Sequence, residues 1–286
     1  MLRMVSQGLL PAETRWDSVR LAVADLGRSL AYYTEKLGLT VHAQSPSHAR
    51  LGAPGAPFLV LEEEPGAWPA RHVTGLFHFA VLVPSRASLA GSLRRMIETR
   101  TSLQGAADHL VSEALYLGDP DGNGIEIYRD RPRDEWRWES GEIAMATEPL
   151  DLQALHNEAR EPWNGLPLGT VLGHVHLHVA RIPASERFYR EVIGFDLTTR
   201  FGPTASFLSA GGYHHHLAVN TWAGLDAPRP PEGAAGLRES VLALPSASDV
   251  DDVQRRAEAA GVPVRRDAQG LAFEDPSGNA LRIVTG

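Results

Sequence analysis

The chain of 286 residues contains no cysteine. This absence excludes disulfide bonds, zinc sites built from thiolates, and cysteine nucleophiles. Long apolar runs are missing too, because no stretch approaches the roughly 18 residues that a membrane-spanning helix needs. The first residues, MLRMVSQGLLPAETRW, lack the apolar core and small-residue cleavage site of a signal peptide. We therefore expect a cytoplasmic protein.

Positive charge is also scarce, since 27 lysines and arginines face 35 aspartates and glutamates, for a net charge of −8. This acidic balance gives no reason to expect nucleic acid or an anionic membrane as a partner. Hydrophobic residues make up 43 % of the chain. The chain is therefore long and apolar enough for one large or two ordinary domains. The composition leaves the oligomeric state open and is compatible with a homo-oligomer.

An internal repeat organises the chain. The segment VRLAVADLGRSLAYYTEKLGLTV, 19–41, aligns without gaps with VHLHVARIPASERFYREVIGFDL, 175–197, at an offset of 156 residues. GDPDGNGIEIY, from Gly118, aligns with EDPSGNALRIV, from Glu274, at the same offset of 156. The same offset at two distant places indicates two homologous halves. We predict a first half at residues 1–130, a connector at 131–168 and a second half at 169–286.

Each half divides again into two similar units. Residues 19–23 alternate like a half-buried strand, and Leu26, Leu30 and Tyr33 then follow helical spacing. Strand-like pieces come next, and the turn DPDGNG has the Asp-Pro and Asn-Gly chemistry of a link between strands. The pattern predicts strand–helix–strand–strand–strand units, four in the whole chain.

Half of the twelve histidines fall in two short clusters, at 174–178 and 214–216. In LGHVHLHVA, 172–180, every second position from His174 to His178 is histidine. Successive side chains of an extended strand point to opposite faces, so these three histidines share one face. Such a face is a metal site, a catalytic surface or a hydrated side of a sheet.

Four motifs resemble those of the vicinal oxygen chelate superfamily, which includes glyoxalase I, bleomycin-resistance proteins and extradiol dioxygenases. They are HVHLHVARIPASERFYREVIGF, GLFHFAVLVPSR, LYLGDPDGNGIEIYRDRPRDEW and SAGGYHHHLAVNTWAG. The resemblance covers nearly all of residues 16–284, and the last two motifs are similar to those of catechol-2,3-dioxygenase-type proteins of Bacillus-like bacteria. It implies an α+β fold of four βαβββ modules in two homologous halves, with mixed sheets curled into cups.

The resemblance also says where metal ligands would lie, on the first and last strands of the modules. The first-strand positions hold Ser18, His78, His174 and Glu239, and the last-strand positions that are not apolar hold Glu126 and Arg282. Strand alternation turns His78, Glu126 and His174 toward the cup. Two histidines and one carboxylate suit Fe(II) first, then Mn(II), with zinc third.

These three ligands can meet only if modules two and three share one cup. Modules one and four would then form a second cup without metal, in which Glu239 and Arg282 form a structural ion pair. We therefore predict a nested arrangement with a single site built from both halves.

Further residues would serve the proton chemistry of such a site, since histidine moves protons near neutral pH. The resemblance places Tyr116 and His109 near the substrate, and it gives the acid–base role to a histidine in YHHHLAVN. Direct motif alignment favours His215. Strand alternation favours His216 and His214, and we rank His215 before His216.

Two more histidines are expected around the site. His214 and His176 are predicted to contact the substrate or to support the residues that bind the metal. His176 shares the cup face with His174, so a merely hydrated position is the alternative for it.

The resemblance implies an Fe(II)-dependent extradiol dioxygenase that cleaves a catechol-type ring with O2 to a semialdehyde. One alternative is another metal-dependent member of the superfamily, a glyoxalase-like isomerase or lyase or a thiol transferase. Those members often complete the ligand set with a second carboxylate or a glutamine. A second alternative is a non-catalytic protein that binds small molecules, although such proteins commonly lose the ligands.

Overall fold

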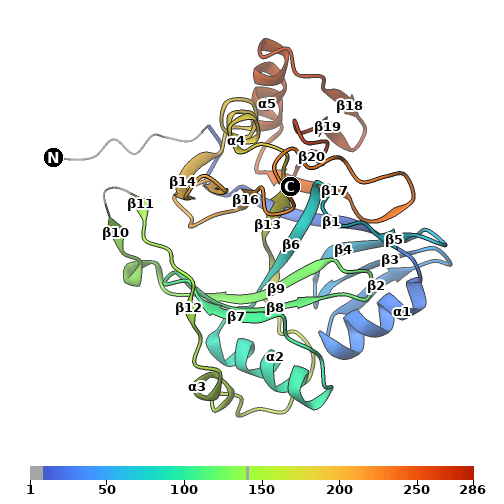
Figure 1. Cartoon of the computed structure of the whole chain (residues 1–286), viewed down its shortest axis with the longest axis vertical. Helices are drawn as coiled ribbons and strands as arrows, with labels where there is room; N and C mark the ends of the chain where they lie inside the picture. Colours follow the sequence, from blue (N-terminus) through green and yellow to red (C-terminus); the bar gives the residue numbers. More distant parts are fainter. Residues whose placement is uncertain (1–8, 140–141) are drawn as a thin grey trace.

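The computed structural model describes residues 9–139 and 142–286 (Figure 1). Residues 1–8 of the predicted first half and 140–141 of the predicted connector lie outside the described residues. Four βαβββ modules follow one another along the chain, so the predicted α+β fold is confirmed.

The first half contains modules one and two. Module one comprises β1 (Arg15–Val23), α1 (Leu26–Ala31) with the π-type turn η1 (Tyr32–Lys36), β2 (Thr40–Gln44), β3 (His48–Ala53) and β4 (Ala56–Glu63). The short β5 (Trp68–Pro69) follows. Module two comprises β6 (Gly75–Leu82), α2 (Arg86–Glu98), β7 (Gly105–Asp108), β8 (Ser112–Gly118) and β9 (Gly124–Asp130).

The second half repeats this order. Module three comprises β13 (Val171–His178), α4 (Ile182–Arg187) with η3 (Phe188–Ile193), β14 (Asp196–Phe201), β15 (Ala205–Ser209) and β16 (Leu217–Asn220). Module four comprises β17 (Ala234–Leu244), α5 (Ala247–Ala259), β18 (Arg265–Asp267), β19 (Gly270–Glu274) and β20 (Ala280–Thr285). Residues 131–168, predicted as a connector, contain η2 (Arg133–Glu135), β10 (Trp138–Glu139), β11 (Glu142–Ile143), β12 (Glu148–Pro149) and α3 (Leu152–His156).

The modules pair across the two halves. In each module the first strand lies parallel to the last, as β6 does to β9 and β13 to β16. The first strands of two modules then pair antiparallel, β6 with β13 and β1 with β17. One sheet therefore runs β12-β7-β8-β9-β6-β13-β16-β15-β14, and the other runs β18-β19-β20-β17-β1-β4-β3-β2. The nested arrangement, with module two beside three and module one beside four, is confirmed.

Alternation along β6 and β13 decides which side chains enter the core. Phe79 and Val81 on β6, and Val175 and Leu177 on β13, are buried in the hydrophobic core, and all four are at most 1 % exposed. Burying apolar side chains on one face is the main favourable term in folding. The intervening positions of both strands therefore face the concave side of the sheet.

A buried tyrosine–aspartate hydrogen bond joins the two modules of each half. The Tyr33 hydroxyl donates to the Asp119 carboxylate at 2.9 Å, and the Tyr189 hydroxyl donates to that of Asp275 at 3.1 Å. Each aspartate caps the turn before the last strand of module two or four. These buried hydrogen bonds join modules of the same half, while the sheets join modules of opposite halves.

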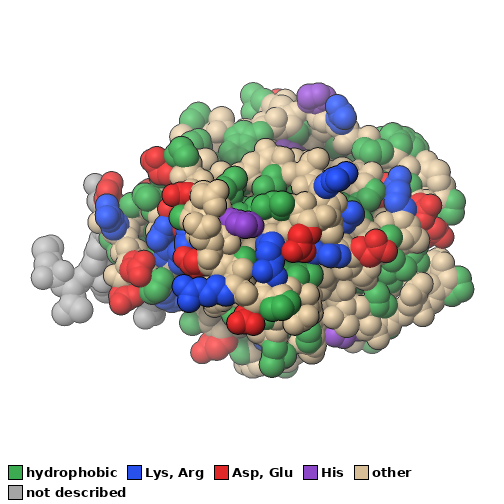
Figure 2. All heavy atoms as spheres, turned by 90° about the horizontal axis from the view of Figure 1, so that it is seen from below, with side chains coloured by type: hydrophobic (Ala, Val, Ile, Leu, Met, Phe, Trp, Pro, Cys, Tyr) green, Lys and Arg blue, Asp and Glu red, His purple; other side chains and the backbone are tan. Residues whose placement is uncertain are grey.

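Helices cover the outside of the sheets. In Figure 1, α2 and α3 lie together beneath β7 and β8, whereas α4 and α5 lie at the opposite end of the molecule. The face seen in Figure 2 mixes cationic, anionic and apolar side chains. None of the described helices is long and apolar enough to cross a membrane.

Candidate metal centre and its cavity

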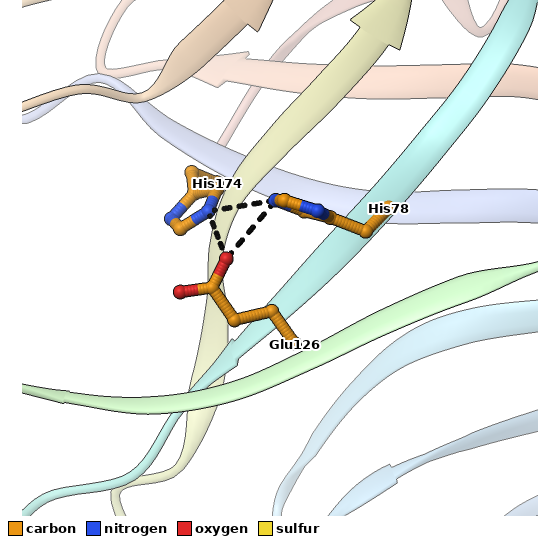
Figure 3. Close-up of side chains that lie close together, drawn as sticks. All are labelled: His78, Glu126 and His174. Carbon is orange, nitrogen blue, oxygen red and sulfur yellow. Dashed lines mark hydrogen bonds and ion pairs between the residues drawn. The ribbon is translucent and has the colours of Figure 1, made fainter. Parts of the chain in front are cut away.

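Three buried side chains converge where β6, β9 and β13 lie side by side (Figure 3). Glu126 Oε2 lies 3.0 Å from His78 Nε2 and 3.1 Å from His174 Nε2. The two Nε2 atoms are 3.3 Å apart. Each side chain comes from a different strand of the sheet that modules two and three share, so strand pairing alone brings the three together.

Burial and the contacts between these side chains set the charge of the cluster. Burial lowers the pKa of His174 to about 4, so the imidazole is neutral near neutral pH. Burial alone would raise the pKa of Glu126, but His174 and His78 beside it hold that pKa well below its ordinary value. The cluster thus presents imidazole nitrogens around one buried carboxylate charge.

These residues fit a divalent cation. The ligand atoms of His78, Glu126 and His174 all lie within 4.8 Å of one another. Two imidazole nitrogens that face each other beside a carboxylate offer lone pairs to one point in space, which a cation satisfies well. His174 Nδ1 is buried with no hydrogen-bond partner among the described residues.

A cavity of about 280 Å³ opens beside the cluster. Polar side chains that line it include His78, His109, Tyr116, Glu126, His176 and His215. A largely apolar pocket with a few convergent polar groups is the usual form of a small-molecule site. The structure thus brings six of the nine residues singled out in the sequence to one cavity.

His215 is held by a chain of hydrogen bonds that ends on Asp130. Asp130 Oδ1 lies 2.8 Å from His214 Nε2, and His214 Nδ1 lies 2.7 Å from His215 Nδ1. Because a carboxylate only accepts, His214 Nε2 carries the proton and its Nδ1 accepts from His215 Nδ1. His215 Nε2 is then left without a proton. Burial, with His174 nearby, also lowers the pKa of His215 well below its ordinary value.

Tyr116 and His109 form a second hydrogen-bonded pair. His109 Nδ1 lies 2.7 Å from the carbonyl oxygen of Ala146, so it donates there. His109 Nε2 therefore accepts from the Tyr116 hydroxyl at 2.6 Å. Burial raises the pKa of Tyr116 well above 10, with Glu126 adding to the effect, so the phenol keeps its proton.

Asn220 fixes the orientation of His176. Its Nδ2 donates to His176 Nε2 at 2.9 Å, while its Oδ1 accepts from His178 Nδ1 at 2.7 Å. Burial lowers the pKa of His176 well below its ordinary value, so its ring is neutral. His176 lines the cavity as a rigid, uncharged wall beside Phe77.

His214 and His216 lie away from the cavity lining. The His214 ring contacts Trp136 and Tyr213, and His216 Nδ1 accepts from the backbone N–H of Ala210 at 3.1 Å. Strand alternation does not apply at these positions because β16 begins only at Leu217. Residues 211–216 form a turn followed by bends instead, and of the three successive histidines only His215 lines the cavity.

Sequence reasoning missed Asp130, which anchors the His214–His215 chain. A signal was available, because Glu126, Tyr128 and Asp130 alternate along β9 and so share its concave face. It also missed that residues 145–147, inside the predicted connector, line the cavity.

In the sheet of modules one and four, the positions that correspond to the candidate metal ligands carry other side chains. Register places Val241 opposite Arg282, as it places Ala80 opposite Glu126. The Arg282 guanidinium there donates to the Glu239 carboxylate at 3.0 Å. The predicted ion pair is confirmed.

The fold and the cluster define a class: proteins of four βαβββ modules with a two-histidine, one-carboxylate centre in one pair of modules. The family model described as Glyoxalase/Bleomycin resistance protein/Dioxygenase superfamily matches residues 15–127 and 171–283. These stretches cover most of the chain and are again offset by the repeat length. The chain belongs to this superfamily.

Known proteins agree with this membership. Over 274 residues the chain is 42 % identical to a protein of Bacillus subtilis (strain 168) named catechol-2,3-dioxygenase, covering 94 % of this chain and 96 % of that protein. A candidate dioxygenase from Bacillus subtilis shares the fold with a TM-score of 0.63 at 14 % identity, over 98 % of this chain and 86 % of its own. Glyoxalase I from Zea mays does so with a TM-score of 0.59 at 18 % identity, over 96 % and 92 %.

Proposed function

We propose that this protein is an Fe(II)-dependent extradiol dioxygenase that cleaves a catechol-type ring with O2. The observation that carries the proposal is the buried triad of His78, Glu126 and His174 at the end of a cavity. Two histidines and one carboxylate are typical of non-haem Fe(II) oxygenases, which leave open positions for substrate and O2. The 42 % identity to a protein named catechol-2,3-dioxygenase supports the same reaction.

Iron would be held by His78, Glu126 and His174, with Mn(II) as the second choice. When bound, it would bring a catechol and O2 together and let electrons pass between them. The remaining residues of the cavity bind the ring, orient it and move its protons.

His215 would act as the base at the cavity wall. Its Nε2 has no proton when Nδ1 donates to His214, so it can accept a proton from a catechol hydroxyl. His214 and Asp130 would support the cation that forms, because the Asp130 carboxylate lies 2.8 Å from His214. His215 could then return the proton to the product.

Tyr116 would orient the ring. Its hydroxyl donates to His109, so its oxygen lone pairs stay available to accept from a substrate hydroxyl. His176, held by Asn220, would limit where the ring lies. We further propose a cytoplasmic location and one active site per chain, in a monomer or a homo-oligomer.

The test is to purify the protein without oxygen, load it with Fe(II), add catechol and admit O2. We expect about one iron per chain and a yellow ring-fission product. Apo protein and protein loaded with Zn(II) are the controls and should give no colour. If iron-loaded protein leaves simple and substituted catechols uncleaved, the proposal is wrong.

A further inference from the structure

We propose that the substrate is a catechol with an uncharged, apolar ring substituent, and that Glu186 enforces this choice by engaging Arg200. The inference rests on the proposed function and names the substrate class of the same cavity. Three features carry it: the volume of the cavity, two rows of aromatic rings, and the ion pairing of Arg200 in its lining.

The cavity is larger than catechol needs. Its volume of about 280 Å³ corresponds to about nine water molecules at liquid density. Catechol has eight non-hydrogen atoms, and covalent bonds hold these closer together than separate waters. Part of the cavity therefore stays unfilled when the ring hydroxyls are at the metal ligands.

Aromatic rings lead outward from the metal ligands along two rows. In one row, Phe77 lies 4.9 Å from the ring of His78 and 5.2 Å from that of Trp222. In the other, the ring of His215 lies 4.1 Å from that of His174 and 5.1 Å from that of Phe207. All four outer rings line the cavity, so both rows extend its wall away from the candidate metal ligands.

The outer wall is apolar as well. Phe201 and Trp222 line the cavity yet are 57 % and 47 % exposed, which places them at its mouth. Met145 and Val111 add further apolar lining. Aromatic side chains exposed singly are common, but here they border a cavity that a substituent can enter. An alkyl or aryl group would bury them and gain hydrophobic free energy.

A negatively charged substituent would find no unpaired lysine or arginine among the described residues of the cavity lining. Arg200 is the only lysine or arginine among the described residues that line the cavity. Its Nε donates to Glu186 Oε2 at 3.0 Å, and its Nη2 donates to Glu186 Oε1 at 2.6 Å. This two-point pairing offsets the charge of the guanidinium and engages its Nε and one Nη2 donor, the pair that would otherwise bind a carboxylate side-on.

Other contacts hold Glu186 in place, so breaking its ion pair with Arg200 is unfavourable. It is only 9 % exposed and accepts from the Ser206 hydroxyl at 3.1 Å. Arg190 adds an ion pair at 3.2 Å. A carboxylated catechol would have to break this arrangement or lose its hydration without a partner, and both cost free energy.

The first experiment compares 4-isobutylcatechol with 3,4-dihydroxyphenylacetate, whose substituents match in size and shape but differ in charge. The corresponding 3-substituted pair covers the other ring position. We expect kcat/KM to be about 10–200-fold higher for the alkyl compounds, the range that apolar pocket contacts supply. Equal values, or a preference for the carboxylates, would overturn the inference.

Equilibrium binding to the iron-loaded protein without oxygen separates the two proposals. If no catechol is cleaved, the proposed reaction is wrong, but the order of the affinities still decides the substrate class. Tighter binding of the isobutyl compound supports the inference, and tighter binding of the carboxylate contradicts it.

Glu186→Gln then tests the role of the ion pair. The amide keeps the shape of Glu186 but frees the charge of Arg200, so kcat/KM for the carboxylate should rise about tenfold relative to that for the isobutyl compound. Glu191→Gln is the matched control, because it makes the same change at an exposed glutamate of η3 that does not line the cavity, and it should leave the ratio unchanged. An unchanged ratio in both variants counts against the assignment of Glu186.

Trp222→Ala tests the apolar mouth. It should weaken binding of 4-isobutylcatechol about tenfold and binding of catechol less, because only the substituent reaches the mouth. Leu225→Ala is the matched control, because Leu225 is 69 % exposed in the same loop and does not line this cavity. A similar loss for both ligands would show that Trp222 does not contact the substituent.

Discussion

Single residues decide which of the two sheets can hold a metal. The concave positions of one sheet carry His78, Glu126 and His174, whereas the corresponding positions of the other include Glu239 and Arg282. An arginine adjacent to a glutamate neutralises it internally, so no cation is needed there. The same backbone therefore carries a candidate metal centre or an ion pair, depending on three side chains.

Glu126→Gln should abolish metal binding, because it removes the only carboxylate of the cluster. We expect metal affinity to fall by at least about 100-fold, above the effect of changing an outer supporting residue. The measurement is metal per chain after gel filtration, with circular dichroism to confirm folding. Glu239→Gln, at the corresponding position of the other sheet, should retain the metal. Full occupancy in Glu126→Gln would contradict the proposed ligand set.

His214→Leu should impair proton transfer by His215 without removing His215. The change deletes the acceptor for His215 Nδ1, so the proton can move to Nε2 and block the base. We expect kcat to fall about 100-fold, the lower range for a lost general base, with little change in KM.

Nitrogen-15 NMR of the histidine rings gives a readout of this change that does not depend on activity. His215 Nε2 should be unprotonated in the wild type and protonated in His214→Leu. His214→Gln offers an amide oxygen as a replacement acceptor and should recover part of kcat. The same tautomer in all three proteins would refute the role of His214.

At the scale of elements, β13 places His174 only because its neighbour is a glycine. A Cβ at Gly173 would overlap the Tyr128 hydroxyl and lie 2.7 and 2.9 Å from two carbons of its ring. Tyr128 is fully buried, and its hydroxyl lies 2.9 Å from that of Tyr213. The aromatic ring packed across β13 thus requires glycine beside His174.

Gly173→Ala should destabilise the protein by about 1–3 kcal/mol, the usual cost of overpacking a core. It should also weaken metal binding, because Tyr128 contacts His174 with ring centroids 4.8 Å apart. Urea unfolding and metal titration measure both effects. The control is Gly91→Ala inside α2, where the nearest atom lies 3.5 Å away and alanine favours the helix. Equal stability of the two variants would show that Tyr128 adapts freely.

Strand alternation was reliable where the chain is extended and failed where it is not. It assigned His78, Glu126 and His174 to the concave face correctly, since all three lie inside regular strands. At 214–216 it favoured His216 and His214, whereas in the structure His215 lines the cavity. The period of two holds only for β geometry, and these histidines precede β16.

The whole molecule buries several neutral histidines, and this should make it sensitive to acid. Burial lowers the pKa of His216 to about 3, with His214 and His174 contributing. Between about pH 3 and the unfolded value of 6.5, the unfolded chain binds the extra proton. Titration of His216 therefore leaves the free energy of unfolding unchanged above about pH 6.5 and lowers it as the pH falls below that value.

His216→Gln should reduce that dependence. Between pH 7 and pH 5 the metal-free wild type should lose about 2 kcal/mol more unfolding free energy than the variant. Urea unfolding at several pH values measures the difference. The exposed His48 provides the control, His48→Gln, which should follow the wild type. Parallel curves for wild type and His216→Gln would contradict the burial argument.

The sequence by itself determined the four modules, the repeat and the residues suited to bind a metal. Hydrophobic alternation, helical spacing and turn chemistry act over a few residues, so they can be read locally. The repeat offset extended that local information to matching positions in the other half. The resemblance then indicated which positions on those strand faces would bind a metal.

Only the tertiary structure decided which histidine of 214–216 lines the cavity, that Asp130 anchors it, and that Glu186 engages Arg200. These contacts join residues 14 or 84 positions apart, or depend on turns without a fixed period. The pairing of modules two and three could be argued from ligand chemistry, yet only β6 lying against β13 established it. Local pattern sets the faces of strands, whereas the packing of the complete sheets determines which faces meet.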